Sequence, residues 1–320
     1  MPFSHILGQN SAISILQRSL ATGRLAHAYL FEGTEGVGKK ATALALIEAV
    51  FCGKEEGCGA CPSCRKIAAL QHPDLHLVEP DGAFIKIDQI RDLQKDLAYR
   101  PFEAPKKACI IDGAERFNQA AGNALLKTLE EPPGNALIIL VTAQSSGVLP
   151  TILSRCQRLH FQTLPEETIA AYLGRNGIDG EAARIAASLA GGSMKKALEI
   201  SKETTLSDRK QFLERLIGLS LREITPLFSA AEELAADKDK VMELLELLTS
   251  FLRDILLLKG GGEGIVNADL LPILEREAGR LSQTGIMERI GHVAAARHAL
   301  LRNVNARLTL EVLFMRLAET

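Results

Sequence analysis

Short and nearly continuous runs of apolar residues alternate with amphipathic segments over the first half of the chain. Runs of this kind are typical of strands covered on both faces, and their alternation with helical segments predicts a parallel sheet with crossover helices. A buried helical turn is the alternative for any one run, but the lengths and the flanking Asp, Pro and Gly residues favour strands. The predicted strands are residues 27–32, 74–79, 107–112, 136–142 and 156–161.

The pattern changes after Pro165, where the strand signal stops. Residues 166–203 predict three short helices, and residues 206–320 predict longer amphipathic helices with a break at the glycine cluster of residues 260–264. We therefore expect three domains. They are a nucleotide-binding-like α/β domain over residues 1–164, a helical lid over residues 165–205 and an all-helical domain over residues 206–320.

Composition excludes several modes of action. The 320-residue chain has a net charge of −2 with 24% charged residues, so only a local patch could attract nucleic acid. Trp is absent and aromatic residues make up 4%, which disfavours base stacking as the main mode of binding. No run approaches the roughly 18 apolar residues of a spanning helix, and the N-terminus lacks a signal-peptide pattern. We expect a cytoplasmic protein without a membrane partner.

Residues 33–40, Gly-Thr-Glu-Gly-Val-Gly-Lys-Lys, match a phosphate-binding loop at seven of its eight positions. A working loop ends in a Ser or Thr whose hydroxyl ligates Mg²⁺, and Lys40 cannot do so. A short motif can arise by chance, but a strand predicted before it and a helix predicted after it favour a real loop. The residues expected to form this vestigial nucleotide site are Gly33, Gly36, Gly38, Lys39 and Lys40.

Asp112 ends a predicted strand, where P-loop proteins place the carboxylate that supports Mg²⁺. Many such ATPases follow it with a Glu that positions the attacking water, but here the next residue is Gly113, and Glu115 would point elsewhere if the strand ends at Asp112. The alternative is that Asp112 only begins a turn.

Four cysteines lie within thirteen residues with the spacing C-x5-C-x2-C-x2-C. Clustered thiols in a cytosolic chain favour metal binding over disulfides, and four thiolates suit one tetrahedral Zn²⁺ in a closed, structural site. An iron–sulfur cluster and free thiols are the alternatives, although the fourth ligand of an iron–sulfur motif usually lies downstream. The predicted zinc ligands are Cys52, Cys58, Cys61 and Cys64.

Several segments, spread over essentially the whole chain, match the motifs of one protein family. They are residues 3–9, the strand and loop of residues 27–40, the four cysteines, residues 123–133 with Leu-Glu-Glu-Pro-Pro, the Ser154-Arg155-Cys156 motif and residues 303–311. Together they resemble the AAA+ clamp loaders of bacterial DNA polymerase III. The resemblance implies a P-loop AAA+ domain, a helical lid and an all-α collar. The partners that it implies are gamma/tau motor subunits, a delta subunit, the sliding clamp and primer–template DNA.

Three residues depart from the motor subunits of this family. Lys40 replaces a Ser or Thr, Gly113 replaces a Glu, and Lys195 replaces the lid Arg that faces the nucleotide. Lys keeps the charge of Arg but loses its planar fork. The departures, with the resemblance, imply a subunit that binds ATP and Mg²⁺ weakly or not at all and does not hydrolyse ATP. An active gamma/tau-like ATPase is the alternative. A small-molecule kinase is disfavoured by the helical C-terminal half and by the Ser-Arg-Cys motif.

The Ser154-Arg155-Cys156 motif implies, through the same resemblance, an arginine finger that acts on a neighbouring subunit. Arg155 would then stabilise charge on the phosphoryl group transferred there. The alternative is that Arg155 only caps a preceding helix over residues 148–153.

A short basic stripe is expected on the helix that Asp88 would cap. The candidate DNA contacts are Arg91, Lys95 and Arg100. Contacts of this kind would be sequence-independent and would weaken with salt. The alternative is an ordinary solvated helix face.

Overall fold

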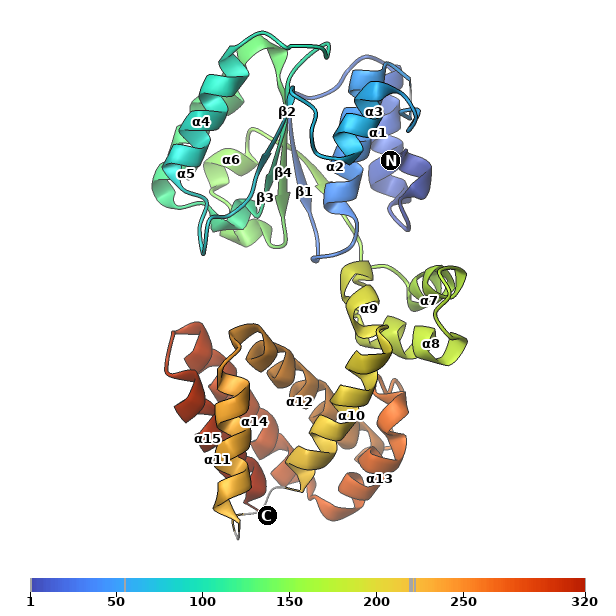
Figure 1. Cartoon of the computed structure of the whole chain (residues 1–320), viewed down its shortest axis with the longest axis vertical. Helices are drawn as coiled ribbons and strands as arrows, with labels where there is room; N and C mark the ends of the chain where they lie inside the picture. Colours follow the sequence, from blue (N-terminus) through green and yellow to red (C-terminus); the bar gives the residue numbers. More distant parts are fainter. Residues whose placement is uncertain (1, 55, 219–220, 222, 320) are drawn as a thin grey trace. The chain divides into compact units, whose positions relative to one another are not determined.

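The computed structural model describes residues 2–54, 56–218, 221 and 223–319. The chain divides into two compact units, each of which has its own hydrophobic core (Figure 1). Unit 1 comprises residues 1–172 and 191–196. Unit 2 comprises residues 173–190 and 197–320.

Unit 1 is built on a five-stranded parallel sheet with the order β2-β3-β4-β1-β5. Each predicted strand is present, with ends that differ by at most one residue from the prediction. The expected fold class, a P-loop α/β domain followed by helices, is therefore confirmed. The strands are β1 (Ala28–Glu32), β2 (Leu75–Val78), β3 (Ala108–Asp112), β4 (Leu137–Thr142) and β5 (Gln157–His160).

Helices cover both faces of this sheet (Figure 1). Alternate strand residues point to opposite faces, so Tyr29 and Phe31 pack in one core cluster while Leu30 packs in the other. The first cluster also includes residues of α1 (Asn10–Ala21), α2 (Lys39–Cys52) and α3 (Pro62–Ala68). The second includes residues of α4 (Ile87–Ala98), α5 (Gln119–Glu130) and the short α6 (Pro150–Leu153).

Because the strands are parallel, their carboxyl ends meet at one edge of the sheet. Asp112 is opposite Val141, and Glu32 is opposite both Thr142 and His160. Two left-handed glycines, Gly36 and Gly38, lie in the loop that follows β1 at this edge. The edge therefore brings together side chains from segments that are far apart in the sequence.

Helices follow the sheet, as predicted after Pro165. The three short ones are α7 (Glu166–Arg175), α8 (Gly180–Leu189) and α9 (Met194–Ile200). The longer ones are α10 (Glu203–Ile217), α11 (Ile224–Ala235), α12 (Lys238–Lys259), α13 (Leu271–Arg280), α14 (Gln283–Leu301) and α15 (Ala306–Ala318).

The break at the glycine cluster is also present, because α12 ends at Lys259. Beyond the glycines, the buried carboxylate of Asp254 accepts hydrogen bonds from the backbone N–H groups of Val266 and Asn267. These bonds fix the start of the next segment. Among the described residues, no helix is both long enough and apolar enough to cross a lipid bilayer.

Candidate functional site

The phosphate-binding loop connects β1 to α2, as the sequence predicts for a real P-loop. Gly36 and Gly38 adopt φ angles of +79° and +102°, which residues with a Cβ rarely adopt. The loop is packed against the segment that begins α9: a Cβ at Gly36 would lie 2.2 Å from Oγ of Ser193. The backbone N–H of Met194 also donates to the carbonyl oxygen of Gly36 over 3.0 Å. A larger residue at position 36 would therefore break this contact.

Lys39 is bonded to its own loop. Its ammonium group donates to the carbonyl oxygens of Gly33 and Thr34, at 2.5 and 2.7 Å, and the residue is 6% exposed. Burial lowers the pKa of Lys39, and the nearby carboxylates of Asp112 and Glu115 partly offset this change. In a working loop this lysine reaches the terminal phosphates. A phosphate would therefore have to compete with these two carbonyl oxygens for the ammonium group.

Lys40 occupies the position of the missing hydroxyl and forms two ion pairs. Its Nζ lies 2.6 Å from Oε1 of Glu79 and 3.7 Å from Oδ2 of Asp112. Glu79 directly follows β2 and Asp112 ends β3, so the parallel register places both carboxylates at the same edge. Burial raises the pKa of Asp112, and the charge of Lys40 opposes that rise. At this edge of the sheet, the positive charge of Lys40 is therefore paired with two carboxylates of the chain.

Glu115 reaches the end of β4 rather than the strand end at Asp112. One of its carboxylate oxygens accepts from Oγ1 of Thr142 at 2.6 Å and from the backbone N–H of Ala143 at 3.3 Å. Gly113 has a φ of +85°, and a Cβ there would lie 3.1 Å from Cγ of Pro80. The backbone at position 113 is therefore unfavourable for the glutamate of a motor subunit.

Lys195, at the start of α9, pairs with a residue of the loop itself. Its Nζ lies 2.7 Å from Oε1 of Glu35, and both side chains are more than half exposed. This hydrogen bond is the main cause of the lowered pKa of Glu35. All three lysines expected near a nucleotide thus bond to oxygen atoms of the chain.

Arg155 follows α6 and is held against the end of α5. Its Nε and Nη2 donate to the same oxygen, Oε1 of Glu130, at 2.9 and 2.5 Å. Its Nη1 donates to the carbonyl oxygen of Thr151 at 3.0 Å and to Oγ of Ser154 at 3.2 Å. The side chain is 36% exposed.

The contact with Thr151 has the geometry that the helix-cap alternative requires. The helix is shorter than the range considered, because α6 begins at Pro150 rather than at residue 148. Proline suits the first turn of a helix, where no N–H donor is needed. Cys156 is half-buried, and burial raises the pKa of its thiol to about 12.

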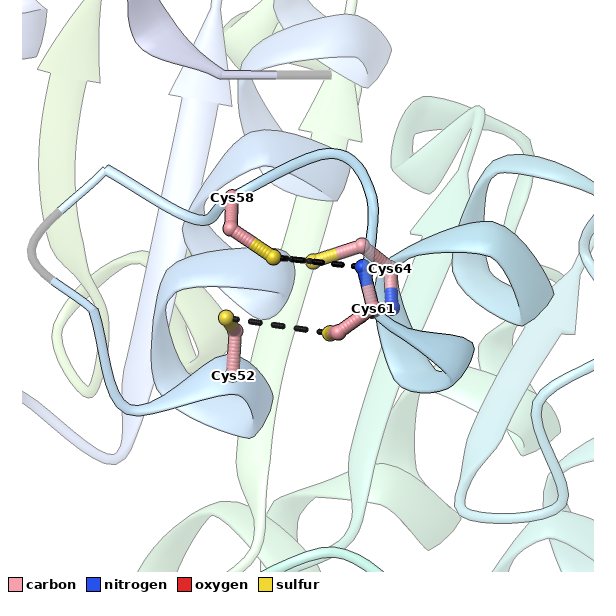
Figure 2. Close-up of side chains that lie close together, drawn as sticks. All are labelled: Cys52, Cys58, Cys61 and Cys64. Atoms are coloured by element: carbon pink, nitrogen blue, oxygen red, sulfur yellow. Dashed lines mark hydrogen bonds between the residues drawn. The ribbon is translucent and has the colours of Figure 1, made fainter.

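The four predicted zinc ligands converge on one point. Figure 2 shows Cys52 at the end of α2, Cys58 in the following loop and Cys61 and Cys64 at the start of α3, with their sulfur atoms close together. All four sulfurs lie within 4.8 Å of one another, and two pairs are 3.8 and 3.9 Å apart. Four thiolates at about 2.3 Å from a tetrahedral zinc ion lie roughly 3.8 Å apart. The arrangement therefore fits a four-sulfur metal site.

Backbone N–H groups of the loop and of α3 donate hydrogen bonds to the cysteine sulfurs and hold them in place. The backbone N–H of Cys61 donates to Sγ of Cys58 at 3.2 Å, and that of Cys64 donates to Sγ of Cys61 at 3.5 Å. Hydrogen bonds from the N–H groups of Ala60 and Cys61 lower the pKa of Cys58 to about 6. Burial raises the pKa of Cys64 to about 12. A bound cation would compensate the charge of the Cys64 thiolate.

Comparison with known proteins connects this geometry to one family. The family model described as "DNA polymerase III, delta subunit" matches residues 8–165, and "DNA polymerase III, delta subunit, C terminal" matches residues 203–319. The DNA polymerase III subunit delta' of Bacillus subtilis (strain 168) is 34% identical, over 97% of this chain and 96% of that relative. The chain belongs to the DNA polymerase III delta' family. The resemblance to clamp-loader AAA+ proteins is thereby confirmed.

Other relatives include a second delta' subunit, a tau subunit and a solved protein of the same fold. The subunit delta' of Haemophilus influenzae (strain Rd) is 32% identical, over 72% of this chain and 70% of that relative. The subunit tau of Escherichia coli (strain K12) is 30% identical over 93% of this chain, which spans 45% of tau. A solved gamma subunit-related protein of Thermotoga maritima shares the fold, with a TM-score of 0.56, 23% identity and coverage of 97% of this chain and 99% of that one.

The candidate DNA contacts of this delta' family member lie on and just after α4. Arg91 pairs with Asp88 at 3.4 Å and Lys95 with Asp92 at 2.9 Å, so carboxylates on the same helix face both cations. The expectation that Asp88 caps the helix is wrong. The N-cap is Lys86, whose backbone N–H donates to the side chain of Gln89, and Asp88 lies inside the first turn.

Sequence reasoning missed two partners at the candidate sites of this delta' family member. Glu79 was the last residue of a predicted strand, so its place at the carboxyl edge beside Asp112 could have been inferred from the parallel topology. Glu130 belongs to the Leu-Glu-Glu-Pro-Pro motif, but no local pattern links it to Arg155, which is 25 residues away. That pair depends on how α5 and α6 pack.

Proposed function

We propose that this chain is a clamp-loader subunit that does not hydrolyse ATP and that completes the ATP site of a neighbouring motor ATPase. In this role it is a rigid member, or stator, of a pentameric ring. The ring loads the sliding clamp onto primer–template DNA for replication. Its motor members are gamma/tau subunits, and a delta subunit is a further member. Residues 1–164, 165–205 and 206–320 serve as the AAA+ domain, the lid and the collar.

The ion pairs of Lys40 carry the first half of this proposal. The position that needs a magnesium-binding hydroxyl instead holds an ammonium group 2.6 Å from Glu79 and 3.7 Å from Asp112. A divalent ion placed beside Asp112 would be repelled by this charge. Lys39 is bonded to loop carbonyls and Lys195 to Glu35, so nucleotide would have to displace protein contacts at each lysine.

Arg155 carries the second half of the proposal, that the chain completes the ATP site of a neighbouring subunit. It belongs to the Ser-Arg-Cys motif and is partly exposed. Its hydrogen bonds go to Glu130, Thr151 and Ser154, which lie outside the phosphate-binding loop. A guanidinium group offered across a subunit interface can stabilise charge on a transferring phosphoryl group. The contact with the carbonyl of Thr151 supports a capping role as well, and the two roles differ in their effect on the assembled ring.

A structural Zn²⁺ is the proposed cofactor. The four sulfurs of Cys52, Cys58, Cys61 and Cys64 leave no open position for water or substrate, so the ion would hold the α2–α3 connection rather than take part in chemistry.

A separate proposal is that Arg91, Lys95 and Arg100 contact DNA directly. The carboxylates beside Arg91 and Lys95 would weaken it.

An active gamma/tau-like ATPase is the second candidate, favoured by the left-handed loop glycines and by the 30% identity to a tau subunit. One assay separates the two functions. Purified chain alone is tested for DNA-stimulated ATP hydrolysis, and then mixed with gamma/tau and delta subunits of the same source. We expect no turnover alone and entry into a pentamer; turnover by the isolated chain would favour the second candidate.

A further inference from the structure

The guanidinium group of Arg155 is engaged along the edge that a phosphate would use. Nε and Nη2 form one edge of the planar fork, and both donate to Oε1 of Glu130. Carboxylates and phosphates are recognised by the same parallel N–H groups. Nη1 is also occupied, by Thr151 and Ser154. An anion outside the chain can therefore use the Nε–Nη2 edge only after Glu130 has released it.

The position of Glu130 is unfavourable for a carboxylate on its own. It is the last residue of α5, where the helix dipole and the free carbonyl groups disfavour negative charge. The carboxylate is half exposed, and Arg155 compensates its charge. The stability of α5 alone does not explain a glutamate at this position, whereas an interaction with Arg155 does.

We propose that Glu130 holds Arg155 in a docked position and competes for it with the phosphates of the neighbouring subunit's nucleotide. This inference rests on the proposed role of Arg155 as a finger. A half-exposed ion pair is weak, so a triphosphate with its greater charge can displace the carboxylate. The docked state lowers the fraction of subunits whose finger is free, and apparent affinity for the ligand falls by that fraction. Glu130 therefore sets the nucleotide concentration that the neighbouring site requires rather than its maximal rate.

Docking is tested on the isolated chain with phenylglyoxal, which modifies free guanidinium groups. Mass spectrometry follows the rate of modification at Arg155 in wild type, Glu130→Gln and the matched control Glu131→Gln. Glu131 is the exposed neighbour in sequence, and its substitution makes the same change of charge. We expect Glu130→Gln to raise the rate of modification by up to about fivefold, the factor that corresponds to the free energy of an exposed ion pair. Glu131→Gln should leave the rate unchanged. Equal rates in all three proteins would overturn docking.

Competition is tested in the ring reconstituted with gamma/tau and delta subunits. We expect Glu130→Gln to lower the KM for ATP by up to about fivefold with kcat maintained, and Glu131→Gln to change neither. In an Arg155→Ala background, Glu130→Gln should have no effect. A fall in kcat would overturn the inference, because Glu130 would then position the finger instead of competing for it.

The proposed function and the inference fail differently in this experiment. If Arg155→Ala leaves hydrolysis by the assembled ring unchanged, the finger itself is wrong. If Arg155→Ala slows hydrolysis while Glu130→Gln leaves KM unchanged, the finger stands and the competition is overturned.

Discussion

The ammonium nitrogen of Lys40 lies 2.6 Å from Oε1 of Glu79, at the edge of the sheet where P-loop proteins hold Mg²⁺. Oδ2 of Asp112 lies 3.7 Å from the same ammonium nitrogen. A positive charge that belongs to the chain thus faces the carboxylates that would otherwise support a metal ion. This relationship leads to distinct expectations for nucleotide, for metal and for repaired variants.

ATP should bind the isolated chain weakly or not at all, and Mg²⁺ should add little. The loop lacks the hydroxyl that couples the metal to the nucleotide, and Lys40 repels a cation beside Asp112. Titration calorimetry with ATP, with and without Mg²⁺, measures both effects. Tight binding that depends on Mg²⁺ would mean that Asp112 alone supports the ion.

The double variant Lys40→Thr, Gly113→Glu should show at most weak ATP hydrolysis. It restores the hydroxyl and the carboxylate, but Lys195 still replaces the lid Arg. A glutamate at position 113 must also adopt a φ near +85°, with its Cβ 3.1 Å from Pro80. Strain of this kind costs on the order of 1–3 kcal/mol. Lys40→Thr alone is the control, and vigorous turnover by the double variant would contradict the account.

The purified chain should carry one Zn²⁺ bound by the four clustered cysteines. Elemental analysis measures the metal, and iron, or zinc below about half an equivalent, would contradict the assignment. Cys52→Ala should lose the ion and loosen residues 52–64 more than the sheet, because metal binding is coupled to local folding. Hydrogen exchange locates the change. Cys109→Ala is the control, since Cys109 is buried in β3 and outside the cluster.

Unit 1 should lose stability as the pH falls below the ordinary histidine range. Burial lowers the pKa of His72 and of His76, so the unfolded chain takes up protons at a higher pH than the folded chain. The stability that these two histidines contribute is therefore fully present above the unfolded pKa of about 6.5, and it is lost as the pH falls through that value.

Urea midpoints of unfolding, measured at several pH values between about 7.5 and 5.5, test this prediction around the unfolded histidine pKa. His76→Leu should make the pH dependence shallower, whatever its effect on stability at neutral pH. Zinc release also depends on pH, so wild type and variant are compared at the same zinc concentration. An unchanged slope in the variant would show that His76 does not contribute.

The sheet was predictable because its strands are buried on both faces. Continuous apolar runs such as residues 137–141 have few alternatives at that length, and all five strands lie within one residue of the predicted ends. The start of α4 was less predictable. Asp88 is a favoured cap residue, but the observed contact is made by Gln89, which reaches back to Lys86, a pair that lacks the usual Ser or Thr.

The sequence predicted which residues belong to the candidate sites, but it did not predict which side chains they contact. The cysteine spacing was sufficient to group the four sulfurs, because the ligands are close in sequence. The pairs of Lys40 with Glu79 and of Arg155 with Glu130 span 39 and 25 residues and depend on strand register and helix packing. The strand pattern could place Glu79 at the carboxyl edge of the sheet, but it does not say which side chains pair, so both contacts required the structure.

The most direct test of the central claim is ATP hydrolysis by a reconstituted ring that carries Arg155→Ala. The variant should fold and enter the ring, with at most a slight fall in melting temperature from the lost contact with Thr151, and gel filtration checks its assembly. DNA-stimulated hydrolysis should fall by at least about twofold, less than the ~10³–10⁵ measured for single-site GTPases, because the other sites of the ring have their own fingers.

Arg155→Lys should also be impaired, since it keeps the charge and loses the planar fork. Arg175→Ala, at the exposed end of α7, is the matched control and should hydrolyse ATP at the wild-type rate. A helix cap alone would lower the melting temperature of Arg155→Ala slightly and leave hydrolysis intact. A fully assembled Arg155→Ala ring with wild-type hydrolysis would contradict the account.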